Sequence, residues 1–155
     1  TLGNAGILWI GLTILLAVRK STRKTAAALA VALGLCLLCG NLLLKPLIGR
    51  IRPFNVQDTI TLLIAAPLDY SFPSGHTMSS FAAAMVLLLT DRRMGIPAMI
   101  LAGLIAFSRM YLYVHYPTDV LVGLLMGCLF GWLAVRIVQK LHARYFQKNQ
   151  QKKPH

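Results

Sequence analysis

The stretch Ala106–Gly123, with the sequence AFSRMYLYVHYPTDVLVG, decides the fold because it joins two long apolar runs through a short polar turn. These runs, residues 96–114 and 118–138, are each close to the about 20 residues that a helix needs to cross a bilayer. Arg109 lies well inside the first run, where a charge costs about 3 kcal/mol unless it is paired or faces water. The two apolar runs therefore predict a membrane protein, and the charge at one end of the helices requires an explanation.

The composition of the whole chain also indicates a membrane protein. Of its 155 residues, 57% are apolar and 13% are charged, and the mean hydropathy is +0.66. The apolar residues come in blocks without the alternation that is typical of β-strands. In lipid, a single segment can form all of its backbone hydrogen bonds only as a helix. We predict an all-α, polytopic transmembrane helix bundle with five spans, at residues 2–18, 25–44, 76–90, 96–114 and 118–138.

The net charge of +12 comes from 16 basic and 4 acidic residues, and the basic residues are unevenly placed. Twelve of them follow the first, third or fifth apolar block, so they share one side if the blocks alternate across the membrane. The positive-inside rule makes this side cytoplasmic. We predict a multi-pass protein of the plasma (inner) membrane with no nucleic-acid partner, and a basic cytoplasmic tail at residues 142–155 that contacts anionic lipid.

The same alternation brings three polar clusters to the extracytoplasmic side, at residues 45–53, 73–76 and 108–119. Each polar residue taken singly has a structural explanation. Lys45 can be a lysine that extends to the interface, and Asp119 can cap a helix. Together, however, the clusters place cations, histidines and a hydroxyl at one end of one bundle, namely Lys45, Arg52, Ser74, His76, Arg109, His115 and Asp119.

This combination predicts a phosphate site. The stretch Pro73-Ser74-Gly75-His76 opens an apolar block, so backbone N–H groups at a helix N-terminus can bind an anion, and arginine guanidinium groups fork onto phosphoryl oxygens. One of the two histidines can attack phosphorus while the other donates a proton to the leaving oxygen. Asp119 can hold an imidazole N–H and fix its tautomer. The carboxylates at positions 58, 69 and 119 have no magnesium-site spacing, so we expect neither metal nor cofactor.

Other features are less specific. Gly123, Gly127 and Gly131 form a small-residue face that allows close helix packing, either inside the bundle or in a homodimer. Residues 60–68, ITLLIAAPL, are too short to span and can form a short helix at the interface. The three cysteines, at positions 36, 39 and 128, lie in apolar blocks and are expected to be small buried residues.

Three motifs resemble the signature of the type 2 phosphatidic acid phosphatase superfamily. Lys45 is followed after six residues by Arg52-Pro53, the second motif is Pro73-Ser74-Gly75-His76, and the third is Ser108-Arg109, five residues, His115, three residues and Asp119. The resemblance implies that His115 is the nucleophile that forms a phosphohistidine, that Asp119 orients it, and that His76 is the general acid. The implied phosphate ligands are Lys45, Arg52, Ser74, Gly75 and Arg109.

The resemblance also carries expectations about the whole chain. Membrane members of the family are six-helix bundles with an extracytoplasmic, metal-independent site, so with five spans counted here a first helix is expected to be missing. Residues 1–141 are then a transmembrane phosphatase domain. We expect a lipid phosphate or diphosphate phosphatase acting on undecaprenyl diphosphate, phosphatidylglycerol phosphate or phosphatidic acid.

Two other functions fit some of these residues. Soluble acid phosphatases and vanadium haloperoxidases share the motifs, but the five apolar spans argue against both. A non-catalytic membrane protein that binds or translocates phospholipid or phosphate is the main alternative, since charges inside a membrane also mark transport paths. The clustering of charge on one side, without paired broken helices in two halves, favours the enzyme.

Overall fold

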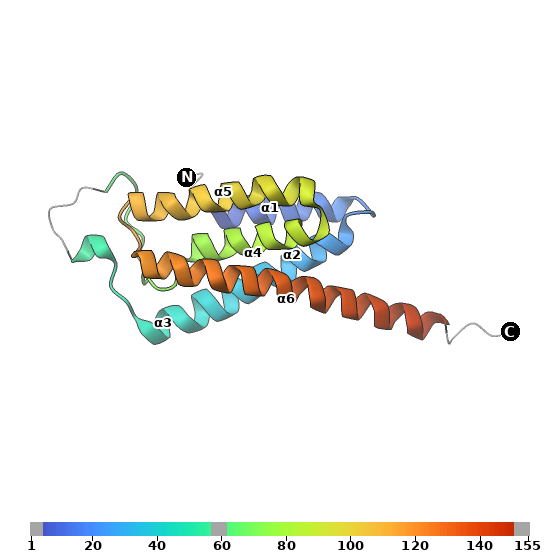
Figure 1. Cartoon of the computed structure of the whole chain (residues 1–155). Coiled ribbons are helices and arrows are strands. Elements are labelled where there is room, and N and C mark those ends of the chain that lie inside the picture. The colour runs from blue at the N-terminus through green and yellow to red at the C-terminus, as the bar shows by residue number, and fades with distance from the viewer. Residues whose placement is uncertain (1–4, 57–61, 151–155) are drawn as a thin grey trace.

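A computed structural model gives the fold of the chain for residues 5–56 and 62–150 (Figure 1). The regular secondary structure of these residues is entirely helical, which confirms the predicted all-α class. The elements are α1 (Ala5–Val18), α2 (Arg23–Leu35), η1 (Cys36–Leu44), α3 (Lys45–Ile48), η2 (Pro53–Asn55), α4 (Gly75–Thr90), α5 (Arg92–Tyr111) and α6 (Pro117–Gln150). The start of the first predicted span and the end of the basic tail lie outside the described residues.

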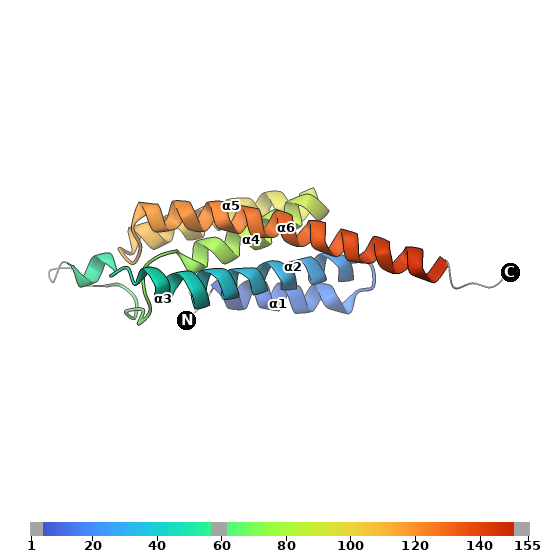
Figure 2. The same ribbon diagram turned by 90° about the horizontal axis from the view of Figure 1, so that it is seen from below.

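The helices form an elongated bundle around α4, which contacts α1, α2, α5 and α6 (Figures 1 and 2). The five predicted apolar blocks are helical in the described residues, except that the helix of the fourth block ends at Tyr111, three residues before the predicted end of the block. Three of these helical segments are long and apolar enough to cross a membrane, namely Arg23–Asn55, Arg92–Tyr111 and Pro117–Tyr145. The other two, Gly6–Val18 and Gly75–Thr90, are apolar but shorter, so the count of five spans stays a prediction.

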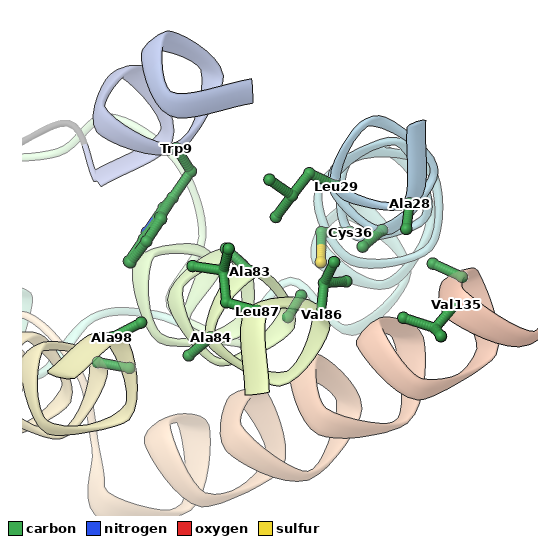
Figure 3. Packing of buried hydrophobic residues seen from close by; sticks show 14 of the residues in the cluster. Trp9, Ala28, Leu29, Cys36, Ala83, Ala84, Val86, Leu87, Ala98 and Val135 are labelled. Atoms are coloured by element: carbon green, nitrogen blue, oxygen red, sulfur yellow. The ribbon is translucent and has the colours of Figure 1, made fainter. Parts of the chain in front are cut away.

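The bundle core lies where α4 meets its four neighbours (Figure 3). Trp9 from α1, Leu29 from α2, Ala98 from α5 and Val135 from α6 all pack against the apolar side chains of α4. Trp9 also donates from its indole N–H to Ser80 Oγ over 3.0 Å, so the polar atom of this ring is satisfied inside the core. By contrast, many large apolar side chains on the outer helix faces are exposed, as expected for a bundle surrounded by lipid.

The second apolar block is a continuous helical segment that changes its hydrogen bonding near the end. In η1 the turns widen to a π-helix, and the backbone N–H of Lys45 donates to the carbonyl of Gly40, five residues earlier. A side chain at Gly40 would clash with Met78 of α4, so this glycine allows the close approach. The helix ends at Gly49, whose φ of 58° is the left-handed conformation typical of a helix C-cap. After this cap the chain leaves the helix and continues to η2.

The connection from η2 to α4 differs from the prediction. The sequence allows a short interfacial helix at residues 60–68, but residues 62–68, the described part of this stretch, are not helical. They contain Pro67. The residues that follow them form hydrogen bonds with another segment of the chain. The N–H of Ser71 donates to the carbonyl of Arg50 over 2.8 Å. The backbone of this connection is thus tied to the polar end of the bundle.

The small-residue face of α6 packs against α4 of the same chain. A Cβ atom at Gly123 would lie 2.8 Å from the Ser74 carbonyl oxygen, and one at Gly131 would lie 2.5 Å from that of Ala82. At Gly127 it would clash with the Met78 carbonyl. These glycines therefore serve packing inside the bundle, and a homodimer through them stays a prediction.

We predict that Gly127→Leu destabilises the protein by about 1–3 kcal/mol or more, because the new side chain must push α6 away from α4. The matched control is Gly103→Leu on α5, where a Cβ atom meets nothing within 4 Å. Thermal unfolding in detergent, followed by tryptophan fluorescence, measures both. Equal midpoints for the two variants would contradict the role assigned to the glycine face.

Candidate active site

The three predicted polar clusters meet at one end of the bundle, on the left in Figure 1. Lys45 begins α3 and Arg52 directly precedes η2. The second cluster lies at the start of α4, and the third lies at the end of α5 and the start of α6. The prediction that separate chain segments converge at one end is therefore confirmed for the described residues.

The starts of α4 and α6 are joined through their backbones. The N–H of Ser74, the N-cap of α4, donates to the carbonyl of Asp119 over 3.1 Å. Ser74 is fully buried, and its hydroxyl lies 3.0 Å from that of Thr77. Next to it, a Cβ atom on Gly75 would lie 2.9 Å from Asn41 Oδ1. The second and third motifs are thus held together by α4–α6 packing.

Arg52 links the first cluster to the third. Its guanidinium is buried, with 4% of the side chain exposed. Nη1 donates to the carbonyl of Val114 over 2.8 Å and lies 3.3 Å from Nε2 of His115. Nε donates to the Asp69 carbonyl over 2.7 Å, and Nη2 to the Asp69 carboxylate over 2.5 Å. Arg52 therefore fixes the loop before α4 and the turn before α6 at once.

The contacts of His115 define its tautomer. A guanidinium has donors only, so the approach of Arg52 Nη1 requires a lone pair on Nε2. The proton of a neutral imidazole then sits on Nδ1, which faces Ser71 Oγ at 3.4 Å and Asp119 Oδ2 at 3.6 Å. This is the tautomer in which Nε2 can act as a nucleophile.

The surroundings of His115 also favour the neutral imidazole. Burial lowers the pKa of His115 below its ordinary value of 6.5. The nearby carboxylate of Asp119 raises this pKa, whereas the positive charges of Arg52 and Lys45 lower it, and the net direction is downward. At neutral pH the imidazole is therefore uncharged and keeps its lone pair.

The carboxylate of Asp119 is fully buried and is held from several sides. Oδ2 accepts hydrogen bonds from the hydroxyl of Ser71 over 2.5 Å and from the backbone N–H of Tyr116 over 3.0 Å. Oδ1 accepts from Arg50 Nη1 over 2.7 Å. Asp119 thus caps the first turn of α6, as one explanation from the sequence expects. Its carboxylate also lies near His115, but its role in orienting this histidine stays a prediction. Its distance from His115 leaves Ser71 as the nearer partner of Nδ1.

Arg109 lies in the last turn of α5, beside the turn that carries His115. Its Nε and Nη2 each donate to Ser108 Oγ over 3.2 Å. The backbone N–H of Val114 donates to the Arg109 carbonyl over 3.2 Å, so the turn before His115 is anchored to the end of α5. The role of Arg109 as a phosphate ligand stays a prediction.

A cavity of about 420 Å³ opens beside the site. The polar part of its lining consists of Asn41, Lys45, Asp69, His76 and Ser79, next to the backbone of Gly75. The wall formed by α1, α2 and the start of η1 is mainly apolar, with Gly6, Ile10, Leu33, Gly34, Cys36 and Leu37. A molecule with a polar head and an apolar tail has the shape and chemistry that match this cavity.

The sequence did not identify three residues that the structure brings into the site. Asp69 pairs with both Lys45 and Arg52. Ser71 lies between His115 and Asp119, and Arg50 pairs with Asp119 while its guanidinium lies 4.0 Å from the centre of the Tyr116 ring. The only sequence signal was position, because Arg50 lies between Lys45 and Arg52 of the first motif, and Asp69 and Ser71 lie within four positions of the second.

Comparisons with known proteins agree with the fold and the motifs. A family model described as the PAP2 superfamily matches residues 23–143. An undecaprenyl-diphosphatase of Sulfolobus acidocaldarius is 38% identical over 131 residues, which cover 84% of this chain and 63% of the relative. A lipid A 4'-phosphatase of Bacteroides thetaiotaomicron is 34% identical over 133 residues, 78% of this chain and 59% of the relative. The chain thus spans about three fifths of the length of these two relatives.

A solved structure supports the same conclusion about the fold. The crystal structure of a transmembrane PAP2 type phosphatidylglycerolphosphate phosphatase from Bacillus subtilis superimposes with a TM-score of 0.70. The two sequences are 27% identical, and the match covers 90% of this chain and 72% of the other.

We predict that NMR titration of ¹⁵N-histidine-labelled protein assigns His115 a pKa below 6.5, because burial disfavours its charged form. Lys45→Gln should raise this pKa toward the ordinary value, since it removes a positive charge. Asp119→Asn should lower it further, since it removes a negative charge. The spectrum of His115→Ala assigns the signal, and shifts of the same sign in both variants would contradict the electrostatics described here.

Proposed function

This chain belongs to the PAP2 superfamily, as its three motifs predict, and on this premise we propose that it is an integral-membrane phosphatase of lipid phosphates or diphosphates. It removes the terminal phosphate, and undecaprenyl diphosphate is the substrate that we favour. Phosphatidylglycerol phosphate and phosphatidic acid offer the same terminal group and are the related candidates. The substrates named for the relatives and for the solved structure, which are polyprenyl, lipid A and glycerolipid phosphates, are consistent with this class.

One observation carries the proposal, namely that the buried imidazole of His115 lies among buried cations with its Nε2 facing Arg52. His115 Nε2 is 3.3 Å from the guanidinium of Arg52, and Lys45 is buried beside the cavity. Phosphoryl transfer depends mainly on positioning and on neutralising the charge of the transferred group. A nucleophile between fixed cations supplies both.

In the first half of the reaction, His115 Nε2 attacks the terminal phosphorus. The P–N bond forms as the P–O bond to the lipid breaks, and the leaving oxygen takes a proton from His76. Lys45, Arg52 and Arg109 hold the phosphoryl oxygens, with Ser74 and Gly75 at the start of α4. Asp119 stabilises the imidazolium that forms, because its carboxylate is fixed near Nδ1.

In the second half, water hydrolyses the phosphohistidine. His76 accepts a proton from the attacking water, the P–N bond breaks, and inorganic phosphate leaves His115 as a neutral imidazole. The products are a lipid with one phosphate fewer and free phosphate. The protein's own cations neutralise charge throughout, so the reaction proceeds without a metal ion.

The site faces the extracytoplasmic side in this proposal. Support comes from the basic residues in the turns between α1 and α2 and between α4 and α5, at the end of the bundle opposite the site (Figure 1). The far part of α6 adds Arg136, Lys140 and Arg144. Basic residues favour the cytoplasmic side of a membrane, so the phosphate site is directed outward.

We predict that purified protein in detergent releases phosphate from undecaprenyl diphosphate in the presence of a chelator, and that His115→Ala lowers kcat at least about a thousandfold. Loss of a nucleophile removes the covalent route entirely. Colorimetric phosphate release measures the rate. Substrate radiolabelled at its terminal phosphate, quenched in alkali because acid hydrolyses the P–N bond, should leave label on the wild-type protein alone.

The matched control is Tyr111→Phe, since Tyr111 is exposed on the outer face of α5 and its substitution should leave the rate unchanged. Activity that survives in His115→Ala, or that chelator abolishes in the wild type, would overturn the mechanism.

A second prediction concerns the apolar wall of the cavity. We expect Gly34→Leu to raise KM for a long-chain lipid phosphate about tenfold, because the new side chain fills space that the lipid tail needs. A Cβ atom at Gly34 meets nothing within 4 Å, so the new side chain extends into the cavity. Activity on a short-chain, water-soluble phosphate should change little. Gly103→Leu, equally open but outside the cavity, is the control, and equal KM values in both variants would reject the assignment of this wall to the tail.

A further inference from the structure

Asp69 forms ion pairs with two of the cations assigned to phosphate. Its Oδ2 accepts a hydrogen bond from Lys45 Nζ, and its Oδ1 accepts from Arg52 Nη2 over 2.5 Å. A single carboxylate therefore bridges residues from the ends of two separate helical segments. Asp69 also lines the cavity together with Lys45 and His76, so its carboxylate shares the space that a substrate phosphate has to reach.

The burial of the three side chains is uneven. The side chains of Lys45 and Arg52 are 8% and 4% exposed, whereas that of Asp69 is 56% exposed. The two cations are fixed within the bundle and need an anion, because an unpaired buried charge is costly. The Asp69 carboxylate is already partly hydrated, so it can leave the cations and move into water at little cost. Asp69 is thus the partner that can leave.

From this geometry we propose that Asp69 is a specificity-determining residue that competes with the substrate's phosphoryl group for Lys45 and Arg52. The inference rests on the proposed function, since it takes these two residues as phosphate ligands. It extends that function by stating which anions gain access to the cations.

The charges of the Asp69 carboxylate and of the substrate phosphate decide which of the two holds Lys45 and Arg52. Burial raises the pKa of the Asp69 carboxyl, but the hydrogen bonds and charges of Lys45 and Arg52 outweigh burial and hold this pKa below its ordinary value. The group therefore carries one negative charge at neutral pH. A terminal phosphate carries about −1.5 to −2 at that pH, so it gains more from the two cations than the carboxylate does.

Bilayer phospholipids differ from the substrate in this respect. Their headgroups are phosphodiesters with a single negative charge on the phosphate, equal to that of Asp69, and they gain nothing over the resident carboxylate. Asp69 thus competes with both kinds of ligand, and the terminal phosphate, which the two cations attract more strongly, displaces the carboxylate more often than a phosphodiester does. The cost is a lower apparent affinity for phosphate, in proportion to the fraction of time that Asp69 holds the cations.

Equilibrium binding of inorganic phosphate and of diethyl phosphate, a soluble phosphodiester, tests the inference in full-length protein in detergent. We expect Asp69→Asn to bind inorganic phosphate about tenfold more tightly, as it would if the carboxylate holds the cations about 90% of the time. We also expect it to bind diethyl phosphate about tenfold more tightly than the wild type does, and in both proteins more weakly than inorganic phosphate. Asp91→Asn is the matched control, because Asp91 caps α5 at the other end of the bundle and its change should alter neither affinity.

A second measurement does not depend on the folding of Asp69→Asn. Leu68 is fully exposed beside Asp69. A spin label at Leu68→Cys therefore reports on the release of the Asp69 carboxylate from Lys45 and Arg52. The three native cysteines are replaced by alanine in this variant. The mobility of the label should rise when inorganic phosphate saturates the protein and stay constant with diethyl phosphate.

The outcomes separate the two proposals. If the wild type neither binds phosphate nor releases it from lipid, the proposed function and this inference both fail. If the wild type does both, but Asp69→Asn binds phosphate no more tightly or the label does not respond to phosphate, only the inference fails.

Discussion

The close contact of α6 with α4 is the constraint on which the rest of the structure depends. Gly123 lies beside the carbonyl of Ser74, and this proximity lets the N–H of Ser74 reach the carbonyl of Asp119. Any side chain at Gly123 would separate the two backbones. The same contact that packs the bundle therefore sets the distance between the second motif and the third, and with it the position of His115.

A second constraint is the cost of charge inside an apolar bundle. The charged side chains at the polar end form a continuous series of contacts, from Lys45 through Asp69, Arg52 and His115 to Asp119 and Arg50. Within the described residues, every buried side-chain nitrogen and oxygen has a hydrogen-bond partner. Such a network is rigid when it is complete, so the imidazole is held in one tautomer and orientation before any substrate arrives.

Much of this arrangement could be predicted from the sequence because lipid is a demanding solvent. Apolar blocks of helical length leave few alternatives for the backbone, and their alternation predicted that three polar clusters share one end. The loop before α4 could not be predicted in the same way. Its residues 62–68 are not helical, and the partners of Asp69 and Ser71 come from segments 17 to 48 positions away. No local pattern encodes such contacts, because they depend on how the helices pack.

The sequence alone determined the class of the protein and the ends of the helices at which charge gathers, and it predicted the residues that transfer a phosphoryl group in the proposed function. The bilayer and the chemistry of phosphate dictate these features residue by residue. Only the tertiary structure decided that the glycines of α6 face α4, that Ser71 lies between His115 and Asp119, and that Asp69 pairs with Lys45 and Arg52. Those contacts follow from distances between separate segments, which packing sets and which sequence spacing does not.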